Sequence, residues 1–135
     1  MEVLNNGRFG MSSCLAGTQG YLIERAADFA LNRHQFTDKI YKYGAIQEKL
    51  ARMSAEHYAT ESIAYLISQA MDNKAENYHL EAAIGKIFAS ERAWHCADEC
   101  IQIMGGMGFM AQQVKIILLL QTWWSTTNYQ SHFSI

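Results

Sequence analysis

Not one of the 135 residues is a proline, and this absence constrains the fold more than any other feature of the sequence. An interior proline removes a backbone hydrogen bond and breaks or kinks a helix, so a chain without proline can form long, uninterrupted helices. Half of the residues are hydrophobic and 18% are charged, which is an ordinary balance for a globular domain. The length suits one domain with a core of its own, but not a multidomain enzyme.

Apolar residues recur at helical spacing in three segments, which run from about Leu4 to Leu31, from about Tyr43 to Met71 and from about Tyr78 to Met104. On the third segment the spacing predicts a buried stripe of Ala83, Ile87, Ser90, Trp94, Ala97 and Ile101. Residues 32–39 and 72–74 carry no such stripe and are interpreted as connections. The predicted fold class is therefore all-α, an up-down bundle of three long antiparallel helices, one short of a complete four-helix bundle.

Two changes in the sequence mark the end of this bundle. Gly105 and Gly106 are expected to end the third helix, because glycine readily adopts the left-handed backbone conformation found at helix C-termini. After Met110 the amphipathic period is lost, and an apolar run, Ile116–Leu120, is followed by two adjacent tryptophans and a polar tail. We therefore expect residues 1–110 to form the helical bundle and residues 111–135 to be a divergent, poorly ordered tail.

Composition and spacing disfavour several classes of protein. The formal net charge of -2 gives no basic field to attract nucleic acid. The apolar run is far shorter than the roughly 20 residues of a transmembrane helix, and the N-terminus carries no Arg-rich amphipathic targeting segment. The three cysteines are interpreted as free thiols. The alternative is a metal site, because His95 lies beside Cys96. The pair of His95 and Cys96 lacks a second matching cluster, and Glu76–His79 is a single Glu-x-x-His pair where a di-iron bundle needs two. No metal site is therefore expected.

Three positions are candidates for contacting a ligand. Arg33 follows the first helix, where a guanidinium could bind a phosphate through two parallel hydrogen bonds, but a solvated loop arginine has the same sequence signature. The segment Gly105–Gly108 allows a ligand to approach the backbone closely, but it is also typical of a helix end followed by a tight turn. Arg8, near the start of the first helix, could contact a ligand or belong to an ordinary helix terminus. His57 lies on an apolar stripe and is expected to be a hydrogen-bonded core histidine.

Four motifs go beyond these general patterns. They are LNNGRFGM at residues 4–11, NRHQF at residues 32–36, IQEKLARM at residues 46–53 and ECIQIMGGMGF at residues 99–109. Together they resemble the C-terminal domain of the acyl-CoA dehydrogenases, and they occur in the order and at the separations of that family. In detail the sequence is most similar to the very-long-chain members. An unrelated helical interaction domain would require four coincidental matches.

The resemblance implies contacts with FAD, which in this family lies between subunits. It assigns to Arg33 a contact with the cofactor pyrophosphate of the neighbouring protomer, with Gln35 and Phe36 beside it. The family's Q-I-M-G-G segment lines FAD from a partner subunit, which assigns that contact to Gln102, Ile103, Met104, Gly105 and Gly106. The family's N-x-G-R segment contacts the acyl-CoA substrate, which assigns a substrate-binding role to Asn5, Asn6, Gly7 and Arg8.

The sequence also departs from the family. Thr37 stands where a glycine usually follows the R-x-Q-F motif. After Met110 there is no R-D-x-R stretch and no E-G-T-N motif, whose glutamate is the family's catalytic base. Some members carry the base on the first helix of this domain, but the corresponding residues here, Gly10–Ser13, include no carboxylate. No catalytic residue is therefore assigned, and the N-terminal domains that hold most of the flavin are missing from the sequence as well.

The leading hypothesis is a C-terminal fragment of a FAD-dependent dehydrogenase of fatty acid β-oxidation, mitochondrial by resemblance and inactive alone. In the intact enzyme its partners would be acyl-CoA and an electron-transfer flavoprotein. Because a fourth helix is lacking, an exposed apolar strip and self-association are expected. The alternative is a non-catalytic helical module that pairs with full-length acyl-CoA dehydrogenase subunits. A truncated or mis-spliced product, a gene-model fragment and a genuine short isoform are all compatible with the divergent tail.

Overall fold

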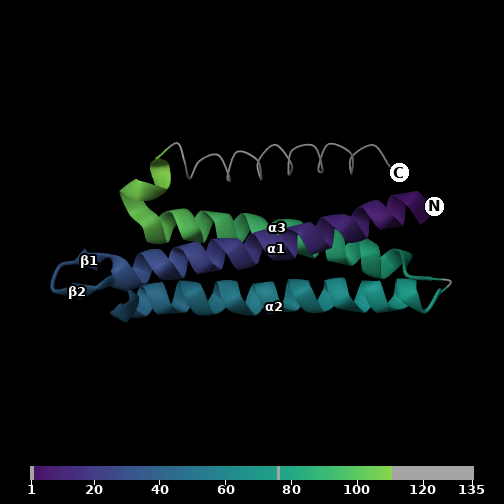
Figure 1. Ribbon diagram of the computed structural model, residues 1–135, viewed down its shortest axis with the longest axis horizontal. Coiled ribbons are helices and arrows are strands. Elements are labelled where there is room, and N and C mark those ends of the chain that lie inside the picture. The colour runs from purple at the N-terminus through teal and green to yellow at the C-terminus, as the bar shows by residue number, and fades with distance from the viewer. Residues whose placement is uncertain (1, 76, 111–135) are drawn as a thin grey trace.

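The computed structural model describes residues 2–75 and 77–110, and these form a bundle of three long helices (Figure 1). The helices are α1 (Glu2–Asn32), α2 (Gly44–Asp72) and α3 (His79–Met104). The chain runs up, down and up, so that α2 is antiparallel to its two neighbours while α1 and α3 point the same way. The predicted all-α bundle is thereby confirmed. The helix bounds lie within about two residues of those expected from periodicity, which is the usual uncertainty of helix ends.

Helices α1 and α2 each turn apolar residues at helical spacing toward the interior of the bundle. Leu22 and Ala26 of α1 pack with Met53 of α2 in a core cluster that also contains residues of α3. Ile67 lies further along the same face of α2 and is fully buried. The charged residues of α1, such as Glu24, are exposed on the opposite side. The hydrophobic effect therefore explains the orientation of these two helices directly.

The predicted buried stripe of α3 is wrong. Of its six members only Ala97 is buried, while Ile87 is 58% exposed and Trp94 is 38% exposed. The residues that face the other helices are instead mostly small, and we call them the small-residue seam: Ala82, Gly85, Ala89, Ala93 and Cys96. A Cβ atom at Gly85 would lie only 2.9 Å from Cδ1 of Ile67. The helices thus approach so closely that small side chains, rather than the most apolar ones, fit between them.

The connection between α1 and α2 is more ordered than predicted. Strands β1 (His34–Gln35) and β2 (Asp38–Lys39) form a short antiparallel hairpin, in which Gln35 pairs with Asp38. A 3-10 helix, η1 (Ile40–Lys42), follows and leads into α2. The backbone N–H of Ile40 donates to the carbonyl of Arg33 at 3.0 Å, which closes the base of the hairpin. The hairpin therefore lies at the end of the bundle where α1 ends and α2 begins (Figure 1).

At the same end of the bundle α3 terminates as the sequence predicts. Gly105 has a positive φ of 55°, a conformation that glycine adopts without steric cost. A second 3-10 helix, η2 (Gly105–Phe109), turns away from α3. A Cβ atom at Gly108 would lie 2.8 Å from the carbonyl oxygen of Ile101, so this turn also requires glycine. The expected boundary at residue 110 and the expected disorder of residues 111–135 fall outside the described residues and remain predictions.

Other sequence predictions concern thiols, metals and membranes. Cys14 is exposed, and Cys96 and Cys100 are buried as free thiols. Burial raises the pKa of Cys96 to about 12 and that of Cys100 to about 11, so both are inert thiols at neutral pH. The described residues contain no group of three or more side chains placed to hold a metal ion. Of the three long helices, none combines the length and hydropathy needed to cross a lipid bilayer, as far as the described ranges extend.

Candidate functional site

A pocket of about 510 Å³ lies at the hairpin end of the bundle. Because α1 and α3 point the same way, their C-terminal ends meet there beside the first turn of α2. We call it the hairpin-end pocket, and it is lined by Phe29, Arg33, Gln35, Phe36, Ile40, Tyr43, Ala45, Ile46, Gln102, Ile103, Met104, Gly105, Gly106 and Met107. All eight residues for which the sequence predicts a cofactor contact are among these. Two segments that lie far apart in the sequence are thus brought together.

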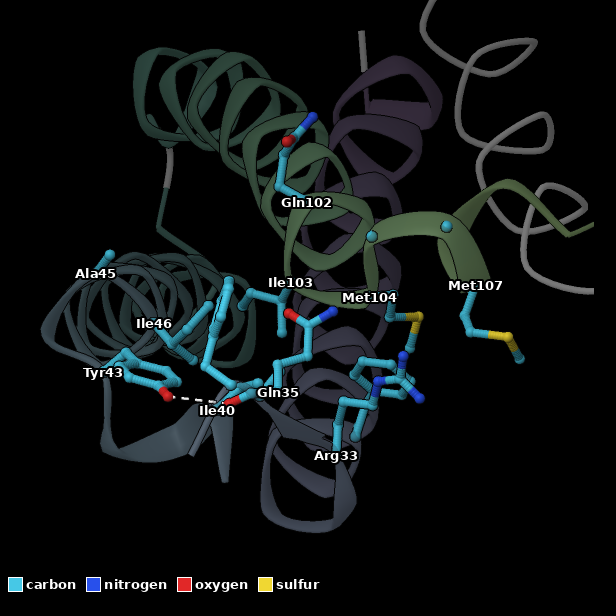
Figure 2. Close-up of a pocket in the computed structure, with 14 residues that line it drawn as sticks. Arg33, Gln35, Ile40, Tyr43, Ala45, Ile46, Gln102, Ile103, Met104 and Met107 are labelled. Atoms are coloured by element: carbon cyan, nitrogen blue, oxygen red, sulfur yellow. Dashed lines mark hydrogen bonds between the residues drawn. The ribbon is translucent and has the colours of Figure 1, made fainter. Parts of the chain in front are cut away.

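The lining residues differ in how they face the pocket (Figure 2). Arg33, Met104 and Met107 lie on one side, opposite Tyr43 and Ile46. Ile103 and Met104 are 4% and 7% exposed, so their side chains form the floor and belong to the core cluster. The amide of Gln102 projects away from the floor and is exposed. The predicted QIMGG segment therefore contributes both to packing and to the pocket surface.

Among the described residues, Arg33 is the single charged residue in the lining of this pocket. Its backbone N–H donates to the carbonyl of Phe29 at 2.9 Å, which continues the hydrogen bonding of α1, while its side chain is exposed. Within the described part of the chain no carboxylate forms a salt bridge with it. A guanidinium that is not neutralised by a neighbouring carboxylate is available for an anionic ligand.

Two glycines form an open wall of the pocket. A Cβ atom added at Gly105 or Gly106 would meet no heavy atom of the described residues within 4 Å, and both glycines are exposed. The backbone there is accessible to a ligand, in contrast to Gly108, whose space is filled by Ile101. A flat or anionic group can approach such a backbone more closely than it can approach a side chain. The pocket as a whole thus combines one cation, accessible backbone and apolar walls.

The predicted substrate-binding residues lie at the other end of α1, far from the hairpin-end pocket. Asn5 is only 1% exposed and is hydrogen-bonded to His79 at the start of α3. Its Oδ1 atom accepts a hydrogen bond from Nη1 of Arg8 at 3.3 Å. Asn6 and Gly7 are exposed. Asn5 therefore holds Arg8 and α3 in place, and the structure does not bring this set together with the cofactor set.

Two further features near Arg8 were missed by the sequence reasoning. Lys86 of α3 has a lowered pKa, because of its partial burial and because of the positive charge of Arg8. A groove of about 320 Å³ between α1 and α2 begins at Phe9, next to Arg8, and is lined by Phe9, Ser13, Ala16, Gly17, His57, Glu61, Ala64, Tyr65 and Ser68. Small residues recur at helical spacing on α1, and this pattern could have indicated the groove, because small side chains leave room between two helices.

His57 differs from the predicted core histidine. It lines this groove and is only partly buried, with its ring against Gly20. Its Nδ1 atom is buried without a hydrogen-bond partner among the described residues. The prediction of a satisfied core histidine is therefore wrong at this atom, although the ring does pack between the helices.

Comparison with known sequences defines the class of protein. The family described as acyl-CoA dehydrogenase, C-terminal domain, matches residues 1–129. The chain therefore belongs to the acyl-CoA dehydrogenase family.

Comparison with individual relatives shows which type of acyl-CoA dehydrogenase the chain resembles. The chain is 60% identical to the mitochondrial very long-chain specific acyl-CoA dehydrogenase of Mus musculus over 112 residues, which are 83% of this chain and 17% of the mouse protein. Butyryl-CoA dehydrogenase from Megasphaera elsdenii has a TM-score of 0.81 and 26% identity over 92% of this chain and 33% of its own. An acyl-CoA dehydrogenase from Bacillus anthracis complexed with FAD has a TM-score of 0.74 and 34% identity over 82% of this chain and 22% of its own. The resemblance to the very-long-chain members is confirmed, and the chain spans only a small part of these relatives.

Proposed function

We propose that this chain is the C-terminal helical part of a FAD-dependent fatty acyl-CoA dehydrogenase of the very-long-chain type, acting in mitochondrial β-oxidation. In this proposal the hairpin-end pocket provides part of the FAD site of a neighbouring subunit. The observation that carries the proposal is the convergence of Arg33–Phe36 and Gln102–Gly106 on one pocket. The similarity to an acyl-CoA dehydrogenase solved with FAD supports the choice of cofactor.

The residues of the pocket fit a phosphate-bearing, partly planar cofactor. Arg33 would hold the pyrophosphate through parallel N–H donors, which is the geometry that guanidinium groups favour. The open backbone of Gly105 and Gly106 would lie against the cofactor, because no side chain intervenes. Ile46 and Met104 would exclude water from the apolar part. When bound, FAD supplies the acceptor for the hydride that leaves the substrate β-carbon.

At the other end of α1, Asn6, Gly7 and Arg8 are proposed to contact acyl-CoA. Asn5 would act indirectly, because its buried side chain accepts a hydrogen bond from Arg8 and so orients it. The adjacent groove has Phe9, Ala16 and Ala64 in its lining and could receive an apolar part of the substrate. In the intact enzyme, an electron-transfer flavoprotein is the proposed electron acceptor.

The isolated chain is proposed to be inactive. Removal of a proton next to a carbonyl requires a base held against that carbon. The 135 residues contain no E-G-T-N motif, and Gly10–Ser13 of the first helix offer no carboxylate in its place. An assay of the purified chain with palmitoyl-CoA and an artificial electron acceptor should give no turnover above a no-enzyme control. Measurable turnover would show that a base is present and would overturn this part of the proposal.

The cofactor role can be tested with an arginine pair. The isolated chain should bind FAD weakly and purify colourless, because the pocket offers only part of the contacts that offset the entropy of binding. Arg33→Ala should weaken FAD binding by roughly ten-fold or more, since hydrogen bonds to charged groups are worth about 1.5–3 kcal/mol. Arg52→Ala is the matched control, because Arg52 is exposed on α2, pairs with Glu48 and is not part of the pocket.

FAD titrations followed by two-dimensional NMR, which detects weak binding, would measure both variants. Equal affinities for Arg33→Ala and the wild-type chain would contradict the cofactor role. The equivalent arginine of a full-length relative should show the same loss, there as dissociation of FAD from the purified enzyme.

A second candidate function is a non-catalytic module that pairs with full-length acyl-CoA dehydrogenase subunits. Leu80, Ile84 and Ile87 favour it, because these α3 side chains are 69%, 52% and 58% exposed and lie on one helix face. Light scattering after size-exclusion chromatography would measure self-association of the chain and its complex with a full-length very-long-chain enzyme. A chain that remains monomeric and does not bind the enzyme would exclude this candidate.

A further inference from the structure

The tip of the hairpin contains an unusual backbone conformation. Gln35 pairs with Asp38, so Phe36 and Thr37 are the two central residues of the turn. Phe36 has a φ of 59°, and Thr37 has no positive φ. A positive φ at the first central position only is the pattern of a type II′ turn, where glycine is the usual residue. A phenylalanine in this conformation is strained and persists only where its surroundings hold it.

Tyr43 provides two contacts that hold the tip of the hairpin, and Figure 2 shows the first of them, a hydrogen bond. Its hydroxyl donates a hydrogen bond to the carbonyl oxygen of Gln35 at 3.0 Å. That oxygen belongs to the peptide group that joins Gln35 to Phe36. The hydrogen bond therefore holds this peptide plane in place, and the φ angle of Phe36 is the rotation relative to that plane. The rings of Phe36 and Tyr43 are also in edge-to-face contact, with centroids 6.5 Å apart and planes at 86°. Apart from this contact Phe36 is exposed, at 96%.

Tyr43 is itself firmly anchored. It directly precedes α2, and its carbonyl accepts hydrogen bonds from the N–H groups of Ile46 and Gln47 at 3.0 and 3.1 Å. Its own N–H donates to the carbonyl of Ile40 at 3.1 Å. Its side chain is half-buried and packs against the core cluster. Tyr43 is thus fixed by α2 and by the core. From this position it supports the strained turn at Phe36, whose side chain is otherwise exposed.

We infer that Tyr43 is a positioning residue for the hairpin-end pocket. It holds the Gln35–Phe36 peptide in place, and through the hairpin it determines where Gln35 and Phe36 stand relative to Arg33 and Gly105. Its effect on a ligand rests on the proposed function, whereas its effect on the hairpin does not. Sequence reasoning singled out Gln35 and Phe36, but not the tyrosine that contacts both of them.

The substitution Tyr43→Phe tests the inference, because it removes only the hydroxyl. Tyr41→Phe is the matched control: it makes the same chemical change two residues earlier, and no hydrogen bond to the hairpin from Tyr41 is found within the described residues. In NMR spectra of the ¹⁵N-labelled chain without ligand, Tyr43→Phe should shift the amide signals of residues 35–38 and speed their hydrogen exchange. Tyr41→Phe should leave these signals in place. Equal effects of both substitutions on the hairpin would overturn the inference.

A second substitution separates positioning from general destabilisation. Phe36→Gly relieves the strain, since glycine adopts a positive φ freely. In the Phe36→Gly background, Tyr43→Phe should therefore change hairpin exchange much less than it does in the wild-type chain. An undiminished effect would show that the hydroxyl does not act on this turn. Circular dichroism should give matching helix content for all variants.

A FAD titration of the same samples connects the hairpin to the ligand. Tyr43→Phe should weaken FAD binding by roughly five-fold, the effect of losing one hydrogen bond that orders the site, while Tyr41→Phe should not. Unchanged FAD affinity with a perturbed hairpin would overturn the link between Tyr43 and the site. If the wild-type chain gave no response to FAD, the proposed function would fail, and the ligand-free spectra would still decide whether Tyr43 positions the hairpin.

Discussion

Two contact regions of α3 hold the bundle together in different ways. The small-residue seam faces α1 and α2 with alanines, a glycine and a thiol, and its stability depends on steric fit. A second region, the charged seam, joins α2 and α3 through Lys49, Glu56, Arg92, His95 and Glu99. The first excludes water almost entirely, whereas the charged side chains of the second remain 14–33% exposed. One interface is therefore sensitive to volume and the other to charge.

The charged seam is a connected network rather than a set of separate pairs. Glu56 accepts a hydrogen bond from Arg92 at 3.1 Å, and its other oxygen lies 2.8 Å from Nδ1 of His95. Nε2 of His95 lies 3.7 Å from Glu99, which pairs in turn with Lys49. Such a network fixes which faces of two helices meet without needing large apolar side chains. This explains how α3 can leave Ile87 exposed and Trp94 partly exposed.

The largest effect is expected from added volume in the small-residue seam. Gly85→Val should destabilise the chain by about 2–3 kcal/mol, because a Cβ atom there already lies 2.9 Å from Ile67 and 3.0 Å from Ile63. Gly17→Val is the control, since a Cβ atom at Gly17 meets no atom of the described residues within 4 Å. Urea unfolding followed by circular dichroism would measure both. Similar stabilities of the two variants would mean that the seam is not close-packed.

A smaller effect is expected from the charged seam. Glu56→Gln keeps the shape but removes the charge that binds Arg92 and His95, and should cost about 1–2 kcal/mol. Glu48→Gln removes the exposed partner of Arg52 and should cost less than about 0.5 kcal/mol. The difference should shrink when the urea titration is repeated at high salt. A salt-independent loss at Glu56 would point to packing instead of charge.

The smallest effect per residue, taken over a single pH unit, concerns the thiols of α3 in alkaline solution. A thiol whose pKa rises on folding stabilises the protein fully below its unfolded value, and this contribution is lost as the pH rises. For Cys96 the window runs from 9.0 to about 12, and for Cys100 from 9.0 to about 11. Each thiol should remove about 1 kcal/mol of stability between pH 9 and pH 10. The variant with Cys96→Ala and Cys100→Ala should lack this part of the pH dependence, and an unchanged slope would argue against the shifted pKa values.

The comparison of the two seams also shows what the sequence could predict. The absence of proline and the helical spacing located all three helices, and Gly105 located the end of the third. The face of α3 could not be predicted, because periodicity ranks residues by hydropathy, whereas Gly85 and the alanines are buried through close approach. The charged seam depends on pairs such as Lys49 with Glu99, which are far apart in the sequence.

The candidate site was predictable in parts. Arg33, Gln35, Phe36 and Gln102–Gly106 were found from motifs, and the pocket contains all of them. Tyr43 and the groove at His57 were not, because each arises only when different elements come together. The hairpin was missed since its strands are two residues long and its turn places phenylalanine where glycine is the expected residue.

The parallel orientation of α1 and α3 affects how precisely the two sides of the pocket are positioned relative to each other. Arg33 stands at the end of one long helix and Gly105 at the end of the other, so their separation depends on the axial register of the two helices. Sliding one helix by a single residue would move its end by about 1.5 Å and rotate it by about 100°. Side chains such as Gln19, whose Nε2 atom donates to the carbonyl of Ala89 at 3.3 Å, prevent that slip from the middle of the bundle. Residues far from the pocket thus set the distance between the Arg33 guanidinium and the backbone of Gly105 and Gly106.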